Sequence, residues 1–380
     1  MKQKNFKNRN PLFHRITLLV LCTALALCVS CNPSGDKTPS ADNTPSTEPP
    51  GIAEKSDYLV IPLTSGNTSP ISAMSYDLLN TVVTIQLYDT ADYDILNECF
   101  ALIDRYERIF SKTKEGSEVY NINHSTETSF TVSDELRELL ALSLSYCALS
   151  DGAFDVTVAP LTSLWDFTNL EHKTSAPANE AIRSALALVD YNDIQLNGNT
   201  LSLAKPGMQL EFGAIAKGYI ADKVKEFLLL KGVRSGIINL GGNVLLVGEK
   251  PDGSAFNTGI QKPFEDRDSV LVAITELRDV SMVSSGIYER YFYDEDGKFY
   301  HHILDPKTGY PINNNLLQVT IISPTSAMGD ALSTSCFALG VEKGMELVHS
   351  LPDVYAVFIT SDGKLHFSDG YLENLPTRTE

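Results

Sequence analysis

The ten residues LEFGAIAKGY at positions 210–219 decide most about the fold of this 380-residue chain. Apolar and polar residues alternate around Glu211, which predicts a strand at residues 208–212 that ends at Gly213. A helix that carries Lys217 is expected to follow directly. Such a junction brings a carboxylate, free backbone groups and a lysine close together. A phosphate-bearing ligand with its metal ion needs a similar mixture, so the junction is a candidate site.

Hydrophobic periodicity predicts helices and mainly antiparallel strands on both sides of this junction. The expected strands lie at residues 81–88, 194–196 and 201–203 (a hairpin around Asn197-Gly198), 236–240, 244–247, 270–274 and 319–322. The expected helices lie at 91–110, from Ser133 to a stop at Asp151-Gly152, and at 214–231, 326–339 and 343–349. The two kinds of element come in clusters and do not alternate strictly, which favours an α+β fold over a doubly wound parallel sheet.

The N-terminal segment has the layout of a secretory signal, with five basic residues before an apolar run at 16–29 that is short for a membrane span. The run ends on Cys28-Val29-Ser30-Cys31, which resembles the lipobox of bacterial lipoproteins, with Cys28 where Leu is usual. We expect a lipoprotein signal peptide at 1–31, lipidation of Cys31, a disordered tether at 32–55 and a globular domain at 56–380. The lipid would hold the protein on the bacterial cell membrane, at its periplasmic or outer face. A plain secreted protein that is cut elsewhere is the alternative.

Charge and cysteine content limit the possible functions. Removal of the leader would take the formal net charge from −18 to about −23, which argues against nucleic-acid binding through a broad basic face. After the leader and the anchor cysteine, Cys99, Cys147 and Cys336 remain, each within an apolar helical pattern. They are expected to be buried thiols rather than a disulfide or a soft-metal site.

Common nucleotide and hydrolase signatures are missing from the sequence, which contains no GxxxxGK[ST], GxGxxG, HExxH or GxSxG. Three loop segments remain as candidates, and each has a plain structural alternative. Residues 152–155 (GAFD) suit a loop close to a flat ring or a simple helix stop. Residues 239–243 (NLGGN) let the backbone approach a diphosphate or form an ordinary turn. Residues 300–309 (YHHILDPKTG) place adjacent histidines on opposite strand faces, before a good type I turn.

A fourth candidate lies on the predicted helix at 326–339. Asp330 and Thr334 are four residues apart and therefore lie on one helix face. A carboxylate and a hydroxyl stacked in this way offer two hard oxygens to Mg²⁺. A hydrogen bond within the helix is the alternative interpretation.

Taken in order, these segments closely resemble the ApbE family. The resemblance rests on residues 80–85, 109–111, 152–155, 210–219, 241–242, 284–289, 302–309 and 330–334, with Ser117 and Asn123. It covers essentially the whole chain after the tether. It implies an ApbE-like (T-fold-like) α+β fold of mixed, mainly antiparallel sheets with flanking helices. Family members are FAD:protein FMN transferases, which are often membrane-anchored lipoproteins.

The resemblance also implies site residues. The metal ligands of Mg²⁺ fall on the Ala214 carbonyl and on the side chains of Asp330 and Thr334. The contacts to FAD, the substrate, fall on Leu79, Ala153, Phe154, Asp155, Glu211, Lys217 and Leu304. Two positions depart from the family pattern: Glu211 replaces the commoner Asp, and Leu79 stands where Met is frequent.

The implied reaction is attack by a threonine or serine hydroxyl of a partner protein on the FMN phosphate of FAD, with AMP leaving. His302 is our candidate for the base, because an imidazole titrates near neutral pH; a structural or substrate-positioning histidine is the alternative. The implied acceptors are redox-pump or electron-transfer subunits that carry an Asp-Gly-[Ser/Thr]-Ala-Thr-like motif. Residues 252–255 (DGSA) begin such a motif, but Phe256 follows, so a hairpin turn is expected there. An FAD diphosphatase and a non-catalytic flavin-binding lipoprotein are the rival functions.

Overall fold

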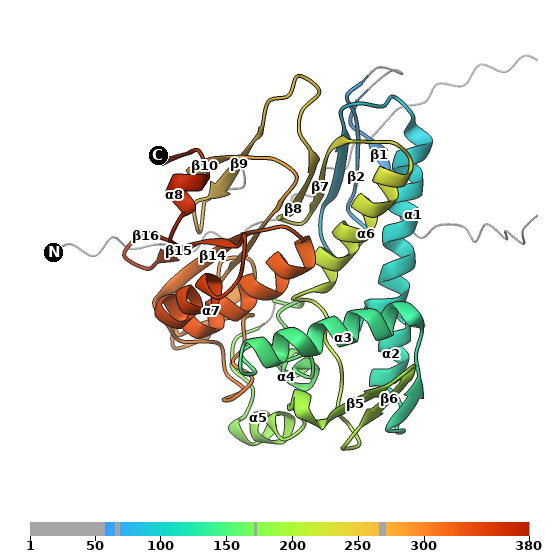
Figure 1. Cartoon of the computed structure of the whole chain (residues 1–380). Coiled ribbons are helices and arrows are strands. Elements are labelled where there is room, and N and C mark those ends of the chain that lie inside the picture. The colour runs from blue at the N-terminus through green and yellow to red at the C-terminus, as the bar shows by residue number, and fades with distance from the viewer. Residues whose placement is uncertain (1–57, 65–68, 171–172, 266–270, 380) are drawn as a thin grey trace, which may run out of the picture. The chain divides into compact units, whose positions relative to one another are not determined.

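The computed structural model describes residues 58–64, 69–170, 173–265 and 271–379 (Figure 1). The predicted signal peptide at 1–31, with Cys31, and the tether at 32–55 lie outside the described residues. None of the helices that the structure describes combines the length and the apolar character needed to cross a bilayer.

A large antiparallel sheet forms the centre of the globular region. Among the described residues it has nine strands in the order β1-β2-β3-β7-β8-β11-β14-β15-β16. The strands are β1 (Ile61–Pro62), β2 (Ile71–Ser75), β3 (Val83–Leu87), β7 (Ser235–Leu240), β8 (Asn243–Gly248), β11 (Ser281–Gly286), β14 (Leu316–Ser323), β15 (Tyr355–Thr360) and β16 (Leu365–Phe367). Strands distant in the chain are therefore neighbours, as where β3 pairs with β7 and β8 with β11.

The two faces of this sheet are covered by different layers. Three long helices pack on one face: α1 (Tyr93–Phe110), α6 (Ala216–Leu230) and α7 (Ser326–His349) (Figure 1). A small sheet packs on the other face with α8 (Tyr371–Asn374): β9 (Phe256–Gln261), β10 (Leu271–Leu277) and β17 (Thr377–Thr379). Side chains alternate accordingly, since Leu245 and Val247 of β8 join the helical core, whereas Leu246 joins the core on the opposite face.

The remaining elements lie around one end of the helical layer. They are α2 (Glu118–Asn123), β4 (Ser129–Thr131), α3 (Asp134–Leu149), α4 (Ala159–Trp165), α5 (Asn179–Leu186), a short 3₁₀ helix (Tyr191–Asp193), β5 (Ile194–Asn197), β6 (Thr200–Leu203), β12 (Tyr291–Tyr293) and β13 (Phe299–His301). The predicted hairpin is confirmed as β5–β6, with Gly198 at φ +55° in the turn. Ser133 caps α3 as expected, because its side chain accepts from the Leu136 N–H.

The sequence-based expectations hold for fold class, with two corrections of detail. The α+β class with mainly antiparallel sheets is confirmed, and Cys99, Cys147 and Cys336 are buried free thiols. The two helices expected at 326–339 and 343–349 form one element, α7, which is interrupted at Gly340 (φ +80°).

The strand predicted at residues 208–212 is wrong. The alternation of buried and partly exposed side chains is present there, but the segment joins none of the sheets that the structure describes. The side chain of Asn123 takes the place of a partner strand, because its Oδ1 accepts from Leu210 N (2.7 Å) and its Nδ2 donates to Leu210 O (2.9 Å). An asparagine side chain can satisfy only one residue of backbone, so no ladder extends along the segment.

The motif-like residues 252–255 form the expected turn between β8 and β9. Gly253 has φ +80°, and its N–H donates to Lys250 O at 2.8 Å. The side chain of Asp252 accepts from both the N–H and the hydroxyl of Ser254.

Candidate active site

The predicted site residues line one cavity of about 400 Å³. This volume is within the size range of ligand pockets. The cavity lining includes all those predicted to bind FAD, the metal or a proton: Leu79, Ala153, Phe154, Asp155, Glu211, Ala214, Lys217, His302, Leu304, Asp330 and Thr334. Cys31, the predicted lipidation site, lies outside the described residues. The cavity therefore joins segments from nearly the whole globular region.

The junction between Phe212 and α6 supplies backbone groups to this cavity. The Gly218 N–H, which in a regular helix would donate to the Ala214 carbonyl, donates instead to Asp330 Oδ2 at 2.9 Å. The Ala214 carbonyl oxygen thus lacks that helical partner. Lys217 Nζ donates to Gly213 O at 3.0 Å and lies 3.9 Å from Asp330 Oδ1.

Helices α6 and α7 meet here with almost no space between them. A Cβ atom at Gly218 would lie 2.2 Å from Ser326 O, so only glycine fits at this contact. Asp222, one turn further along α6, accepts from the N–H groups of Ser326 (2.7 Å) and Ala327 (2.8 Å) at the start of α7. Burial raises the pKa of Asp222 to about 6. These contacts fix the first turns of α7, which carry Asp330.

The Asp330 end of the cavity can hold a hard cation. Asp330 is 4% exposed, and the Thr334 hydroxyl lies 3.4 Å from Ser285 Oγ. Asp330, Thr334 and Ala214 line the same space. Over the described ranges, no group of three or more His, Cys, Asp or Glu side chains could form a metal site. The donor set fits Mg²⁺, which is often bound by one or two carboxylates together with substrate phosphates.

The cavity lining contains a second carboxylate, Glu211, with different surroundings. Glu211 Oε2 lies 2.5 Å from Lys112 Nζ and accepts from Thr162 Oγ1 at 2.7 Å. Lys112 also donates to Thr162 Oγ1 at 2.6 Å. Sequence reasoning missed Lys112 and Thr162. The only sequence signal was that Lys112 directly follows the 109–111 segment of the family resemblance.

The loop at 152–155 lies at the cavity as predicted and also ends a helix. Helix α3 finishes at Leu149, and Gly152 has φ +72° in the turn that follows. The Asp155 carboxylate accepts from the N–H and hydroxyl of Thr157 and from the N–H of Tyr191. Burial raises the pKa of Asp155. The carboxylate therefore holds the loop that presents Ala153 and Phe154 to the cavity.

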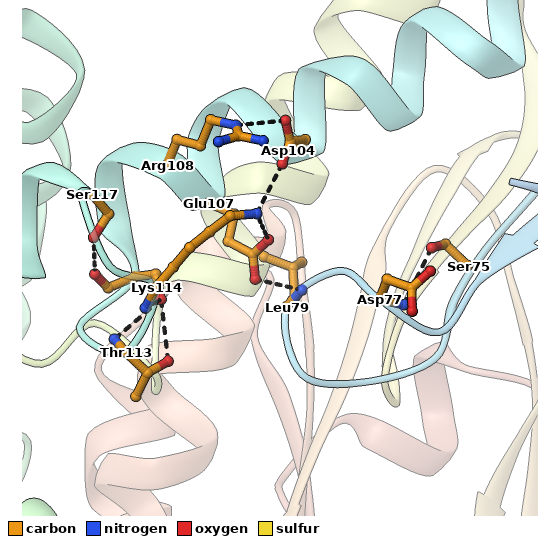
Figure 2. Close-up of polar contacts among 10 residues, drawn as sticks. Ser75, Asp77, Leu79, Asp104, Glu107, Arg108, Thr113, Lys114 and Ser117 are labelled. Atoms are coloured by element: carbon orange, nitrogen blue, oxygen red, sulfur yellow. Dashed lines mark hydrogen bonds and ion pairs between the residues drawn. The ribbon is translucent and has the colours of Figure 1, made fainter. Parts of the chain in front are cut away.

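Leu79 is held at the cavity by a charged network at the C-terminal end of α1 (Figure 2). Leu79 has φ +56°, and its N–H donates to Oε1 of the buried Glu107 at 2.9 Å. Glu107 pairs with Lys114 (3.1 Å), which also reaches Asp104 (3.0 Å), and Asp104 accepts from Arg108 Nε (2.8 Å). The network stabilises an unfavourable backbone conformation where the side chain meets the cavity.

The adjacent histidines have different surroundings, as their alternation predicts. His301 is buried and contacts Ile312 O through Nε2 at 2.9 Å, whereas His302 lines the cavity, as does the buried Leu304 that follows. Loss of hydration, followed by the positive charge of Arg290, lowers the pKa of His302 to about 3. The expectation that this imidazole titrates near neutral pH is therefore wrong for the free protein.

The tautomer of His302 follows from its neighbour. Nδ1 lies 3.3 Å from Arg290 O, and a carbonyl can only accept, so Nδ1 carries the proton. The Nε2 lone pair is then the one that can accept a proton.

Comparison with known proteins places this cavity in a family. Residues 79–359 match the ApbE family, a range that contains every predicted residue of the cavity. The chain belongs to the ApbE family. A Klebsiella pneumoniae (strain 342) protein named FAD:protein FMN transferase is 39% identical over 288 residues, covering 75% of this chain and 88% of the relative. A Treponema pallidum (strain Nichols) protein of the same name is 33% identical over 296 residues, covering 74% and 81%.

Solved structures support the same family assignment. The flavin transferase ApbE from Vibrio cholerae superposes with a TM-score of 0.70 at 27% identity, covering 83% of this chain and 99% of that chain. The ApbE protein from Thermotoga maritima gives a TM-score of 0.71 at 27% identity with the same coverage. The fold is thus ApbE-like over most of the described globular region.

Proposed function

We propose that this chain is a Mg²⁺-dependent FAD:protein FMN transferase. It would attach FMN from FAD to a threonine or serine of an acceptor protein through a phosphoester bond and release AMP. The observation that carries this proposal is the Asp330 end of the cavity. There the buried Asp330 lines one space with Thr334 and with Ala214, whose carbonyl lacks the Gly218 N–H as a partner, in a chain of the ApbE family.

The reaction needs positioning more than covalent chemistry by the protein. The acceptor oxygen bonds to the FMN phosphorus while the bond between that phosphorus and the oxygen bridging to AMP breaks. AMP leaves with the electron pair, and the hydroxyl proton passes to a base. Lys217 adds positive charge beside the diphosphate, and the Asp222 contacts keep Asp330 in place. A Mg²⁺ ion held by Ala214, Asp330 and Thr334 would neutralise phosphate charge when bound.

His302 is the proposed base. Its imidazole is neutral at physiological pH because its pKa is about 3, so Nε2 is available to take a proton. A base this weak transfers protons inefficiently unless its pKa rises. The phosphates of bound FAD would raise that pKa by placing negative charge beside Arg290 and His302. Full transfer activity in His302→Ala would exclude this role.

The remaining parts of the proposal concern location and partner. Lipidation at Cys31 would anchor the enzyme at the extracytoplasmic side of the membrane, where an acceptor with an Asp-Gly-[Ser/Thr]-Ala-Thr-like motif would meet it. Release of Cys31→Ser from the membrane fraction is the corresponding measurement.

One incubation separates the candidate functions. The protein is mixed with FAD, Mg²⁺ and an acceptor domain that carries the motif, and the products are resolved on a denaturing gel. Flavin fluorescence on the acceptor is expected, and it should vanish when the acceptor threonine is replaced by alanine or when EDTA is added. Free FMN without labelled acceptor would favour the diphosphatase, and unchanged FAD would favour a binding protein.

A further inference from the structure

Asn243, the first residue of β8, has a buried donor with no acceptor. The residue is 1% exposed and is one of those that line the cavity. Among the residues that the structure describes, no atom accepts a hydrogen bond from Asn243 Nδ2. A buried amide is costly without a partner, so its N–H groups point to a group that enters the cavity.

The other half of the amide is fixed by the protein. The Ser326 hydroxyl donates to Asn243 Oδ1 at 2.5 Å, and the Ser281 hydroxyl donates to Ser326 Oγ at 2.9 Å. Asn243 Oδ1 therefore faces Ser326 at the start of α7. Because oxygen and nitrogen diverge from the same carbon, the nitrogen is turned away from Ser326.

The surroundings identify the chemistry of the missing acceptor. Ser326 begins α7, one turn before Asp330, so the Asn243 amide belongs to the end of the cavity proposed for the metal and phosphates. Gly241, which precedes Asn243 in the turn between β7 and β8, lines the same cavity with φ +69°. An anionic phosphate oxygen would be a strong acceptor here.

We propose that Asn243 Nδ2 donates a hydrogen bond to a phosphate oxygen of the FAD diphosphate and so positions it against the Asp330 end. This inference rests on the proposed function, because it requires FAD in the cavity. It makes Asn243 a binding residue and Ser326 a positioning residue that acts through it.

The test compares Asn243→Asp with wild type by flavin fluorescence titration. The substitution keeps the shape but replaces the donor with an anionic acceptor, so the Kd for FAD is expected to rise about tenfold or more. The Kd for riboflavin, which has no phosphate, is expected to stay within about twofold. Transfer assays should show a raised KM for FAD.

Thr258→Val is the matched control. Thr258 Oγ1 is also buried, with no hydrogen-bond partner in the described part of the chain, but it belongs to β9 and does not line the cavity. This variant is expected to leave the FAD Kd unchanged. If circular dichroism shows that Asn243→Asp is unfolded, Asn243→Ala replaces it, with an expected rise in the FAD Kd of about threefold or more.

The outcomes keep the two proposals apart. An FAD Kd within twofold of wild type in the folded variant would overturn the role of Asn243, as would equal losses for FAD and riboflavin. If wild type binds FAD but does not label an acceptor, the proposed function is overturned. The role of Asn243 is still decided in that case, because it is tested by the Kd values alone.

Discussion

Two carboxylates line the same cavity, yet their surroundings differ. Glu211 accepts from Thr162 and lies 2.5 Å from the Lys112 ammonium. Asp330 is more deeply buried and accepts from the Gly218 N–H, and the cation nearest to it among the described residues, Lys217, is 3.9 Å away. Glu211 already has a counter-charge from its own chain, which suits it to a structural role in the cavity lining. Asp330 has a more distant counter-charge, which suits it to bind a cation from solution.

The largest expected effect comes from the Asp330 end. Asp330→Asn keeps an oxygen that accepts from the Gly218 N–H but removes the negative charge, so transfer to the acceptor should fall by about 10³-fold with little change in thermal stability. The rate of acceptor labelling at saturating Mg²⁺ and FAD measures this. Glu211→Gln is the matched control at the other carboxylate of the cavity lining and should lose far less. Equal losses in the two variants would show that the two carboxylates have the same role.

A smaller effect is expected when the ion pair of the Glu211 wall is removed. This wall is the part of the cavity lining where Lys112, Thr162 and Glu211 contact one another. Lys112→Met removes the ammonium and leaves Glu211 partly buried beside Thr162, which should weaken FAD binding about fivefold. A double-mutant cycle with Glu211→Gln, read by FAD titration, should give a coupling energy of about 1 kcal/mol. Strictly additive effects of the two substitutions on the FAD Kd would mean that the ion pair between Lys112 and Glu211 does not contribute to FAD binding.

The smallest effect concerns the proton on His302. Because its folded-state pKa is about 3, below the ordinary value of 6.5, the unfolded chain binds this proton more readily. The contribution of neutral His302 to the free energy of unfolding is therefore complete above pH 6.5, and it is lost as the pH falls from 6.5 toward 3. His302→Gln should lose less stability than wild type between pH 7 and pH 5, as measured by urea unfolding midpoints.

Nuclear magnetic resonance gives an independent measurement of the same property. The ring signals of His302 in the free protein should stay at their neutral-imidazole positions from pH 8 to pH 5. A midpoint near 6.5 would contradict the burial and the Arg290 charge as causes.

The sequence predicts the Asp330 end better than the Glu211 wall. Asp330 and Thr334 are four residues apart on one helix, so local periodicity is enough to place them together. Lys112 and Glu211 meet only because the segment after α1 lies beside the segment before α6, and no local pattern records that contact. The segment at 208–212 has the right alternation for a strand, but Asn123 replaces the neighbouring strand. The low pKa of His302 likewise depends on tertiary burial.

The order of strands in the central sheet has a consequence for synthesis of the protein. Leu79 precedes β3, whereas Asp330 and Thr334 lie on α7, after most of the sheet has been translated. Contacts between such distant segments form late and cost loop-closure entropy. A chain that stops before α7 has the Glu211 wall but lacks Asp330 and Thr334, so the Asp330 end of the cavity cannot form until residues 326–349, within the last third of the sequence, have been translated.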